Sequence, residues 1–147
     1  MKEVIAIGCD HAGVKFKAEL IDFLKERGHE VLDCGCYTEE SVDYPDIAEA
    51  TCAKVLSGEA ERAVLICGTG VGISMAANKI HGIRAALCGD CFSAKYTRLH
   101  NDANAICFGA RVMGTGLAKE LLEIFLSTPF EGGRHQRRID KIDLLGR

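Results

Sequence analysis

The sequence predicts an α/β protein with one domain over residues 1–147, a three-layer α/β/α fold of the Rossmann-like type around a five-stranded parallel sheet. Two observations support this prediction. Five short apolar runs recur along the chain, and a stretch with helical periodicity follows each of them. The runs are apolar at nearly every position, which is typical of parallel strands that helices cover on both faces. A chain of 147 residues is also long enough to bury one core.

The five apolar runs are the predicted strands. The first follows Met1-Lys2 directly, and the third leads into a glycine-rich segment. Because a helical stretch lies between consecutive runs, neighbouring strands are expected to be parallel. The predicted strands are 4–8, 30–32, 62–66, 83–87 and 105–108.

The helices follow from apolar spacing and from turn residues. Phe16, Leu20 and Leu24 repeat on one helical face, and Gly28 stands where a left-handed residue ends a helix. Pro45 suits the first turn of the next helix. The predicted helices are 15–27, 44 to about 57, a short one after the glycines at 68–72, 92–99, an amphipathic helix around 117–125 that Pro129 ends, and a basic segment 134–147 with a helix over about 134–145.

The composition argues against two classes of partner. The net charge is −3, whereas a domain that binds nucleic acid is expected to carry a basic excess. No apolar run reaches the roughly 20 residues that a membrane-spanning helix needs. Met1-Lys2 leads into a strand without a secretory apolar region or cleavage site. We therefore expect a cytoplasmic protein that binds neither nucleic acid nor membrane.

Eight cysteines are many for a chain of this length. In a small secreted protein they would indicate disulfides, but in a reducing compartment we expect most of them to pack as small apolar residues. They stand at positions 9, 34, 36, 52, 67, 88, 91 and 107.

The segment 65–74, which reads LICGTGVGIS, predicts a site for negative charge. It joins an apolar strand to a helical pattern through Cys67 and three glycines at alternate positions. Such glycines let backbone N–H groups point toward one spot, and the following helix adds its own unpaired N–H groups and the positive end of its dipole. A thiol beside this cradle indicates a reaction in which negative charge develops.

A second polar segment is expected to face the first one. Strand 4–8 runs into Cys9, Asp10 and His11, just as strand 62–66 runs into Cys67. In an open parallel sheet, ligands bind beyond the carboxyl ends of the strands, where the strand order reverses. We expect the first and third strands to be neighbours there, which would bring these two segments together.

Nucleotide binding remains an alternative interpretation of the glycine segment. A dinucleotide-binding fingerprint would need glycine where Ile73 stands, although Asp90 lies about 20 residues further on. The segment from Gly8 to Gly13 begins like a phosphate-binding P-loop, but Val14 takes the place of the required lysine.

Other motifs also have ordinary structural interpretations. Cys88 and Cys91 form a C-x-x-C pair, which fits a dithiol redox module or mere coincidence. Asp10 could cap the helix that follows it, and 100–102 could cap the end of another. Arg134 and Arg138 share a helix face, which is either a solvated basic face or a clamp for phosphate.

Several separated motifs, in order, resemble the type B ribose-5-phosphate isomerases and their sugar-phosphate isomerase relatives. The similarity extends over nearly the whole chain. It rests on 8–13 (GCDHAG), 43–45 (DYP), 66–74 (ICGTGVGIS), 76–79 (AANK), 82–85 (GIRA), 100–102 (HND), 108–111 (FGAR) and 131–135 (EGGRH).

The resemblance implies an aldose–ketose isomerase that interconverts ribose 5-phosphate and ribulose 5-phosphate in the non-oxidative pentose phosphate pathway. It implies no cofactor and no metal. The reaction opens the sugar ring and moves a proton from C2 to C1 through an enediolate. The catalytic residues it implies are Cys67 as general base, Thr69 as the hydroxyl that moves protons between the substrate oxygens, and His100 with Asp10 for ring opening. The substrate-binding residues it implies are His11, Tyr44, Gly68, Gly70, Val71, Gly72, Asn101, Arg111, Arg134 and Arg138.

The resemblance also implies a homodimer, or a dimer of dimers, whose active sites are shared between subunits. His100, Asn101 and the C-terminal arginines would then reach the site of the neighbouring subunit, and the helix at about 134–145 would pack on it. Some members use a glutamate just after the last glycine as base, but Ile73 stands there in this chain, so the thiol is expected to act. Isomerisation of allose 6-phosphate or galactose 6-phosphate is the alternative within the family.

Overall fold

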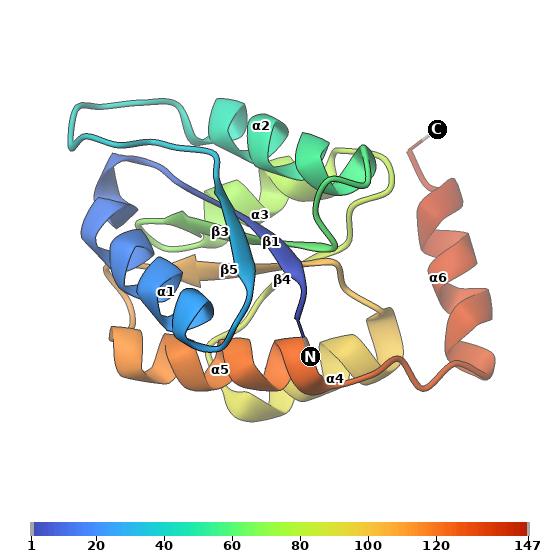
Figure 1. The fold of residues 1–147 in the computed structure, drawn as a ribbon. Coiled ribbons are helices and arrows are strands. Elements are labelled where there is room, and N and C mark those ends of the chain that lie inside the picture. The colour runs from blue at the N-terminus through green and yellow to red at the C-terminus, as the bar shows by residue number, and fades with distance from the viewer. Residues whose placement is uncertain (1, 147) are drawn as a thin grey trace.

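The computed structural model describes residues 2–146, which form a five-stranded sheet in the order β2-β1-β3-β5-β4 (Figure 1). All four strand pairs are parallel. The predicted fold class is therefore confirmed. Met1 and Arg147, which the predicted domain includes, lie outside the described residues. The strands are β1 (Val4–Cys9), β2 (Glu30–Asp33), β3 (Arg62–Cys67), β4 (Ala85–Leu87) and β5 (Ala105–Gly109).

The helices agree with the predicted ones to within a few residues. At the end of the first, Gly28 has φ +85° and the N–H of His29 donates to the carbonyl of Leu24 at 3.0 Å, which is the predicted glycine stop. None of the helices in residues 2–146 is long and apolar enough to cross a membrane. They are α1 (Val14–Glu26), α2 (Tyr44–Leu56), α3 (Val71–Asn78), α4 (Cys91–Asn101), α5 (Thr115–Ser127) and α6 (Arg134–Leu144), with a short 3₁₀ turn η1 (His11–Gly13).

The start predicted for the fourth strand is wrong. The strand begins at Ala85, two residues after Ile83. The N–H of Ile83 donates to the carbonyl of Ile80 in a turn, and the N–H of Arg84 donates to the side chain of Asn104. Ile83 and Arg84 stand directly before the apolar residues of the strand, so the sequence pattern includes them. Their N–H groups, however, donate to acceptors outside the β-sheet hydrogen bonds, so the strand starts later.

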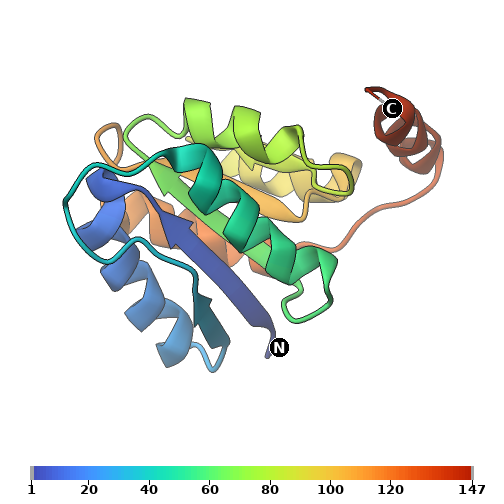
Figure 2. The same ribbon diagram turned by 90° about the horizontal axis from the view of Figure 1, so that it is seen from above.

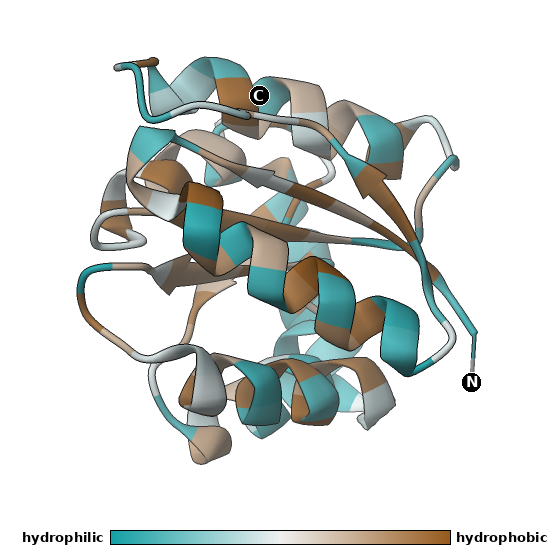
Figure 3. Ribbon diagram, turned by 60° about the vertical axis from the view of Figure 1, so that its left-hand side comes forward, coloured by the Kyte–Doolittle hydropathy of each residue, from teal (hydrophilic) through white to brown (hydrophobic). Residues whose placement is uncertain are grey.

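The helices form two layers around the sheet. α2 and α3 pack on one face, and α1, α4 and α5 cover the other (Figures 1 and 2). The strands between them are mostly apolar, while the helices alternate polar and apolar bands (Figure 3). The core on the α2/α3 side includes Leu65, Ile73 and Cys107, and the core on the other side includes Leu20, Phe108 and Phe125.

Helix α6 stands away from these layers at the end of an extended segment (Figure 2). Within the chain it packs mainly against α4, and an ion pair of 3.5 Å joins Asp143 to Arg84. Ile142 and Leu144 on it, and Leu145 directly after it, are 48%, 65% and 77% exposed. The helix therefore presents apolar side chains that the rest of the described chain leaves uncovered.

Candidate active site

The carboxyl ends of β1 and β3 lie side by side, as predicted. The register pairs Cys9 with Ile66, and the N–H of Asp10 donates to the carbonyl of Ile66 at 3.0 Å. β2 lies on one side of β1, whereas β3, β5 and β4 follow on the other side. The strand order therefore reverses between β1 and β3, which is where ligands bind in folds of this kind.

Cys67 is the last residue of β3 and lies at the start of the glycine loop 68–72. Its side chain is buried on the α2/α3 side of the sheet, and the N–H of Gly70 donates to its sulfur at 3.1 Å. The helix α3 begins at Val71, so its positive end is close to the same sulfur. A hydrogen-bond donor and a helix N-terminus both stabilise negative charge on a thiol.

A side chain at either of two glycines of the loop would collide with a neighbour. Gly70 has φ +80°, and a Cβ there would lie 2.5 Å from Cδ1 of Leu87 and 2.9 Å from the carbonyl carbon of Phe108. A Cβ on Gly72 would lie 2.6 Å from Cζ of Tyr44. The loop is therefore packed closely against the end of β5 on one side and the ring of Tyr44 on the other.

Some backbone N–H groups at the loop have an acceptor within the loop, and others have no acceptor among residues 2–146. Those of Gly70 and Val71 donate inside the loop, to the sulfur of Cys67 and to the hydroxyl of Thr69 at 3.1 Å each. The next N–H groups, of Gly72 and Ile73, belong to the first turn of α3 and have no acceptor within the helix. Ile73 is fully buried, so of these two groups the N–H of Gly72 is the one open to an oxyanion, while the N–H groups of Gly70 and Val71 hold the side chains of Cys67 and Thr69.

Asp10 and His11 follow β1 at the same edge. A carboxylate oxygen of Asp10 accepts from the N–H of Ala12 at 2.9 Å and caps η1, so the ordinary capping interpretation of Asp10 is confirmed. Nδ1 of His11 accepts from the N–H of Val42 at 3.2 Å, which places the hydrogen of the neutral ring on Nε2. His11 thus offers a donor at this edge.

Arg111 comes from the loop after β5 and lies over the glycine loop. Its N–H donates to the carbonyl of Gly68 at 2.9 Å, and its Nη1 would lie 3.3 Å from a Cβ on Gly68. A guanidinium here adds a positive charge beside the loop. We use the name edge cluster for Asp10, His11, Tyr44, Cys67, Thr69, Arg111 and glycines 68, 70 and 72 with Val71.

The other predicted site residues form a second group, the helix cluster of His100, Asn101, Arg134 and Arg138. His100 and Asn101 end α4, and both arginines are exposed on α6. The carbonyl of Asn101 accepts from Nε of Arg84, which precedes β4. Arg84 and Asn101 therefore mark the amino-terminal edge of the sheet.

The edge cluster and the helix cluster do not meet within one chain. α4 begins after the carboxyl end of β4 and runs back along the sheet, and its eleven residues are about 16 Å long. The end of α4 consequently lies at the edge of the sheet opposite the carboxyl end of β3 (Figure 1), and β3 ends at Cys67. A site that uses both groups has to take them from two chains.

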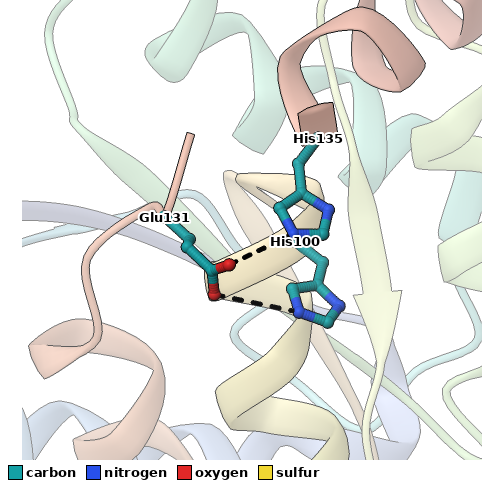
Figure 4. A group of neighbouring side chains, drawn as sticks. All are labelled: His100, Glu131 and His135. Carbon is teal, nitrogen blue, oxygen red and sulfur yellow. Dashed lines mark ion pairs between the residues drawn. The ribbon is translucent and has the colours of Figure 1, made fainter. Parts of the chain in front are cut away.

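Two residues beside the helix cluster belong to the motif 131–135 but are not among the predicted site residues. A carboxylate oxygen of Glu131 lies 3.5 Å from Nε2 of His135, and the other lies 4.0 Å from Nε2 of His100 (Figure 4). The rings of His100 and His135 stack with centroids 4.1 Å apart. The spacing of four residues between Glu131 and His135 was the available sequence signal, because side chains at this spacing can meet where the chain turns.

Known proteins with similar sequences place the chain in a family. The model of the Ribose/Galactose Isomerase family matches residues 5–142. The chain belongs to this family. It is 49% identical over 138 residues to the ribose-5-phosphate isomerase B of Escherichia coli, covering 94% of this chain and 93% of that relative. It is 42% identical to the galactose-6-phosphate isomerase subunit LacB of Clostridium acetobutylicum, covering 94% and 80% respectively.

Solved structures of the Ribose/Galactose Isomerase family have the same fold. The ribose-5-phosphate isomerase B of Clostridium thermocellum superposes with a TM-score of 0.93 at 50% identity, over 97% of this chain and 95% of that one. The ribose 5-phosphate isomerase of Thermotoga maritima gives a TM-score of 0.94 at 50% identity, over 96% and 97%. The recognition of the family from its motifs is confirmed.

Cys88 and Cys91, the C-x-x-C pair of this isomerase-family chain, behave as small apolar residues rather than as a redox pair. All eight cysteines are free thiols. Burial raises the pKa of Cys88 to about 11, and the carboxylate of Asp90 adds to this shift. Burial also raises the pKa of Cys91. Disulfide exchange needs a thiolate, and both thiols are protonated at neutral pH, so the pair is poorly suited to a redox role.

Burial of the core thiols also predicts how stability depends on pH in this family member. Cys52 is fully buried, and burial raises its pKa from 9.0 to about 12. Above pH 9 the unfolded chain loses this proton and the folded chain keeps it, so the free energy of unfolding falls as pH rises toward 12. Between pH 9 and 10 we expect Cys52 to contribute about 1 kcal/mol of this loss. Urea unfolding of the wild type and Cys52→Ala under reducing conditions measures it, and equal pH dependence in the two proteins would contradict the prediction.

Proposed function

We propose that this chain interconverts ribose 5-phosphate and ribulose 5-phosphate, with Cys67 as the base. The observation that carries the proposal is the thiol at the mouth of the glycine loop, which accepts the N–H of Gly70 beside the N-terminus of α3. Isomerisation of an aldose to a ketose needs a base for the proton on C2 and donors for the enediolate oxygens. The edge cluster offers both, and the relatives from Escherichia coli and Clostridium thermocellum carry the name of this activity.

In the proposed reaction, His100 and Asp10 first open the sugar ring by moving a proton between the ring oxygen and the C1 hydroxyl. The thiolate of Cys67 then removes the proton from C2, and the negative charge passes to the carbonyl oxygen on C1. Backbone N–H groups of the glycine loop 68–72, that of Gly72 among them, stabilise that charge. The hydroxyl of Thr69 moves a proton from the oxygen on C2 to the one on C1, and the thiol of Cys67 returns its proton to C1.

The phosphate and the hydroxyl groups of the sugar are held by the other residues. The guanidinium groups of Arg111, Arg134 and Arg138 suit bidentate hydrogen bonds to phosphate oxygens, and Nε2 of His11 adds one donor. Tyr44 and Asn101 line the sugar. Because the phosphate is bound by these side chains, the glycine loop is left to hold the enediolate.

We further propose a homodimer, or a dimer of dimers, in which each site combines the edge cluster of one subunit with the helix cluster of its partner. Two observations support it. The helix cluster lies at the opposite sheet edge from Cys67, and the apolar side chains of α6 are exposed in the single chain. Packing α6 on a second copy would cover those side chains and carry the arginines to the other site. The eight free thiols suit a reducing cytoplasm.

Isomerisation of a six-carbon sugar phosphate is the second candidate, because the galactose-6-phosphate isomerase subunit LacB is 42% identical to this chain. Parallel assays with ribose 5-phosphate, allose 6-phosphate and galactose 6-phosphate separate the two. We expect the highest kcat/KM with ribose 5-phosphate. A higher value with either six-carbon sugar would overturn the assignment of substrate.

Arg138 provides a test of how the phosphate is bound. We expect Arg138→Ala to raise KM for ribose 5-phosphate by roughly ten- to a hundredfold and to lower kcat less, because a lost hydrogen bond to a charged group costs about 1.5–3 kcal/mol of binding. Arg137→Ala removes a neighbouring exposed arginine of the same helix and should leave KM unchanged. If KM does not change in Arg138→Ala, this face of α6 is only solvated.

A further inference from the structure

We propose that His100, Glu131 and His135 form a binding site for a divalent transition-metal ion of the Zn²⁺ class. The three side chains come from the end of α4, from the segment before α6 and from the first turn of α6. Their ligand atoms, one from each residue, all lie within 4.8 Å of one another. Figure 4 shows both imidazole rings on the same side of the carboxylate.

The unsatisfied ring nitrogen of His135 indicates that the cluster of His100, Glu131 and His135 lacks a ligand. The side chain is 6% exposed, and its Nε2 is buried without a hydrogen-bond partner among the described residues. A buried polar nitrogen without a partner is rare in folded proteins and calls for a functional explanation. This nitrogen faces the carboxylate of Glu131 at 3.5 Å, beyond good hydrogen-bond distance. An ion between the two groups would satisfy both.

The distances are close to those of a coordinated ion. Bonds of 2.0–2.1 Å to a tetrahedral zinc place two ligand atoms about 3.3 Å apart. Nε2 of His135 lies 3.5 Å from one carboxylate oxygen of Glu131, and Nε2 of His100 lies 4.0 Å from the other. Since all three ligand atoms lie within 4.8 Å of one another, His100 and the carboxylate have to move until each separation has closed by at most about 1.5 Å.

One ring has to turn when the ion binds. The lone pair of Nε2 lies in the plane of its imidazole ring. The rings of His100 and His135 are stacked with an angle of 14° between their planes, so their two lone pairs do not point at one common position. His135 is fixed by burial, whereas the side chain of His100 is 39% exposed and 55% of Glu131 is exposed. His100 therefore rotates toward Glu131, which separates the stacked rings.

The donor set selects the kind of ion. Two imidazoles and one carboxylate are the ligands of many zinc sites that keep a fourth position open, whereas Mg²⁺ and Ca²⁺ prefer oxygen ligands alone. Arg134 and Arg138 lie nearby on α6 and oppose a cation. Both are exposed in the single chain, and water would still reach them in a shared site without substrate, so they weaken binding without preventing it.

Binding would have a consequence that rests on the proposed function. An ion held by Nε2 of His100 removes the group proposed to open the sugar ring. The metal would therefore inhibit the isomerase reversibly, and a chelator would restore activity.

Cobalt(II) is the probe that tests the site, because its absorption spectrum reports its ligands. The reduced protein is titrated with CoCl₂ in the absence of substrate. We expect one Co²⁺ per chain with visible bands of a nitrogen- and oxygen-ligated ion and without the near-ultraviolet charge-transfer band of a thiolate. Glu131→Gln and His135→Gln should each weaken binding at least about tenfold, while Asp140→Asn, an exposed carboxylate on the same helix, should not.

Each result is informative. A thiolate band in the wild type, or unchanged affinity in Glu131→Gln, would overturn the proposal, and so would the absence of binding at millimolar Co²⁺. Glu131 is exposed, so its variant is expected to fold even if His135→Gln does not. Titration without substrate also keeps the two proposals separate: cobalt binding without turnover of ribose 5-phosphate would refute only the proposed function.

Discussion

Replacing Cys67 by alanine is expected to lower kcat for ribose 5-phosphate by roughly a hundred- to ten-thousandfold, which is the usual contribution of a positioned base. The substitution removes only the thiol group, and the glycine loop, Thr69 and Arg111 remain to bind the substrate. KM should therefore change little, because the loss falls on the transition state rather than on binding. Initial rates of ribulose 5-phosphate formation over a range of substrate concentrations measure both constants.

The control for Cys67→Ala is Cys88→Ala. Cys88 is 1% exposed and packs in the core on the other side of the sheet, so this variant loses a buried thiol of the same size away from the glycine loop. It should keep kcat close to that of the wild type, with thermal unfolding as a check that both variants fold. Full activity in Cys67→Ala together with loss in Cys88→Ala would reverse the assignment of the base.

Mixing two inactive variants is expected to restore activity if the sites are shared between subunits. Cys67→Ala damages the edge cluster and His100→Ala the helix cluster. After subunits exchange at random, half of the dimers contain one chain of each kind, and one of their two sites has neither change. Activity should then return to about a quarter of the wild-type value. Measurement requires partial unfolding in urea, mixing and refolding before the assay.

A second mixture shows whether the recovery has this cause. Cys67→Ala and Thr69→Ala both damage the edge cluster, so every site in their mixed dimers carries one change. This mixture should stay inactive after the same treatment. Recovery in both mixtures, or in neither, would argue against a site built from the edge cluster of one chain and the helix cluster of another.

Much of the fold could be predicted because its signals are local. The β1 and β3 strands are apolar at almost every position, so their burial and parallel pairing follow from their composition. The glycines at 68, 70 and 72 predicted a loop with unusual backbone freedom, and Gly70 has the positive φ that glycine allows. The closeness of Asp10 and Cys67 followed from topology, since each lies just past the end of a neighbouring strand.

The environment of His135 could not be predicted in the same way. It depends on the path of the chain into α6, where Gly132 and Gly133 have φ of +74° and +60° and the N–H of Glu131 donates to the carbonyl of Leu99. These turns place a residue of the C-terminal helix against the end of α4, far from it in sequence. Nothing in the spacing of the motif 131–135 specifies that partner.

The close packing of the glycine loop limits how this enzyme family can change its substrate. In the proposed reaction backbone N–H groups hold the enediolate, and a side chain at Gly70 or Gly72 would collide with the end of β5 or with Tyr44, so the loop itself offers little means to distinguish one sugar from another. A preference for five or six carbons must then arise at the side chains around the loop, such as Tyr44 and the arginines. If the proposed reaction holds, the loop determines the chemistry and the side chains around it determine the length of the sugar.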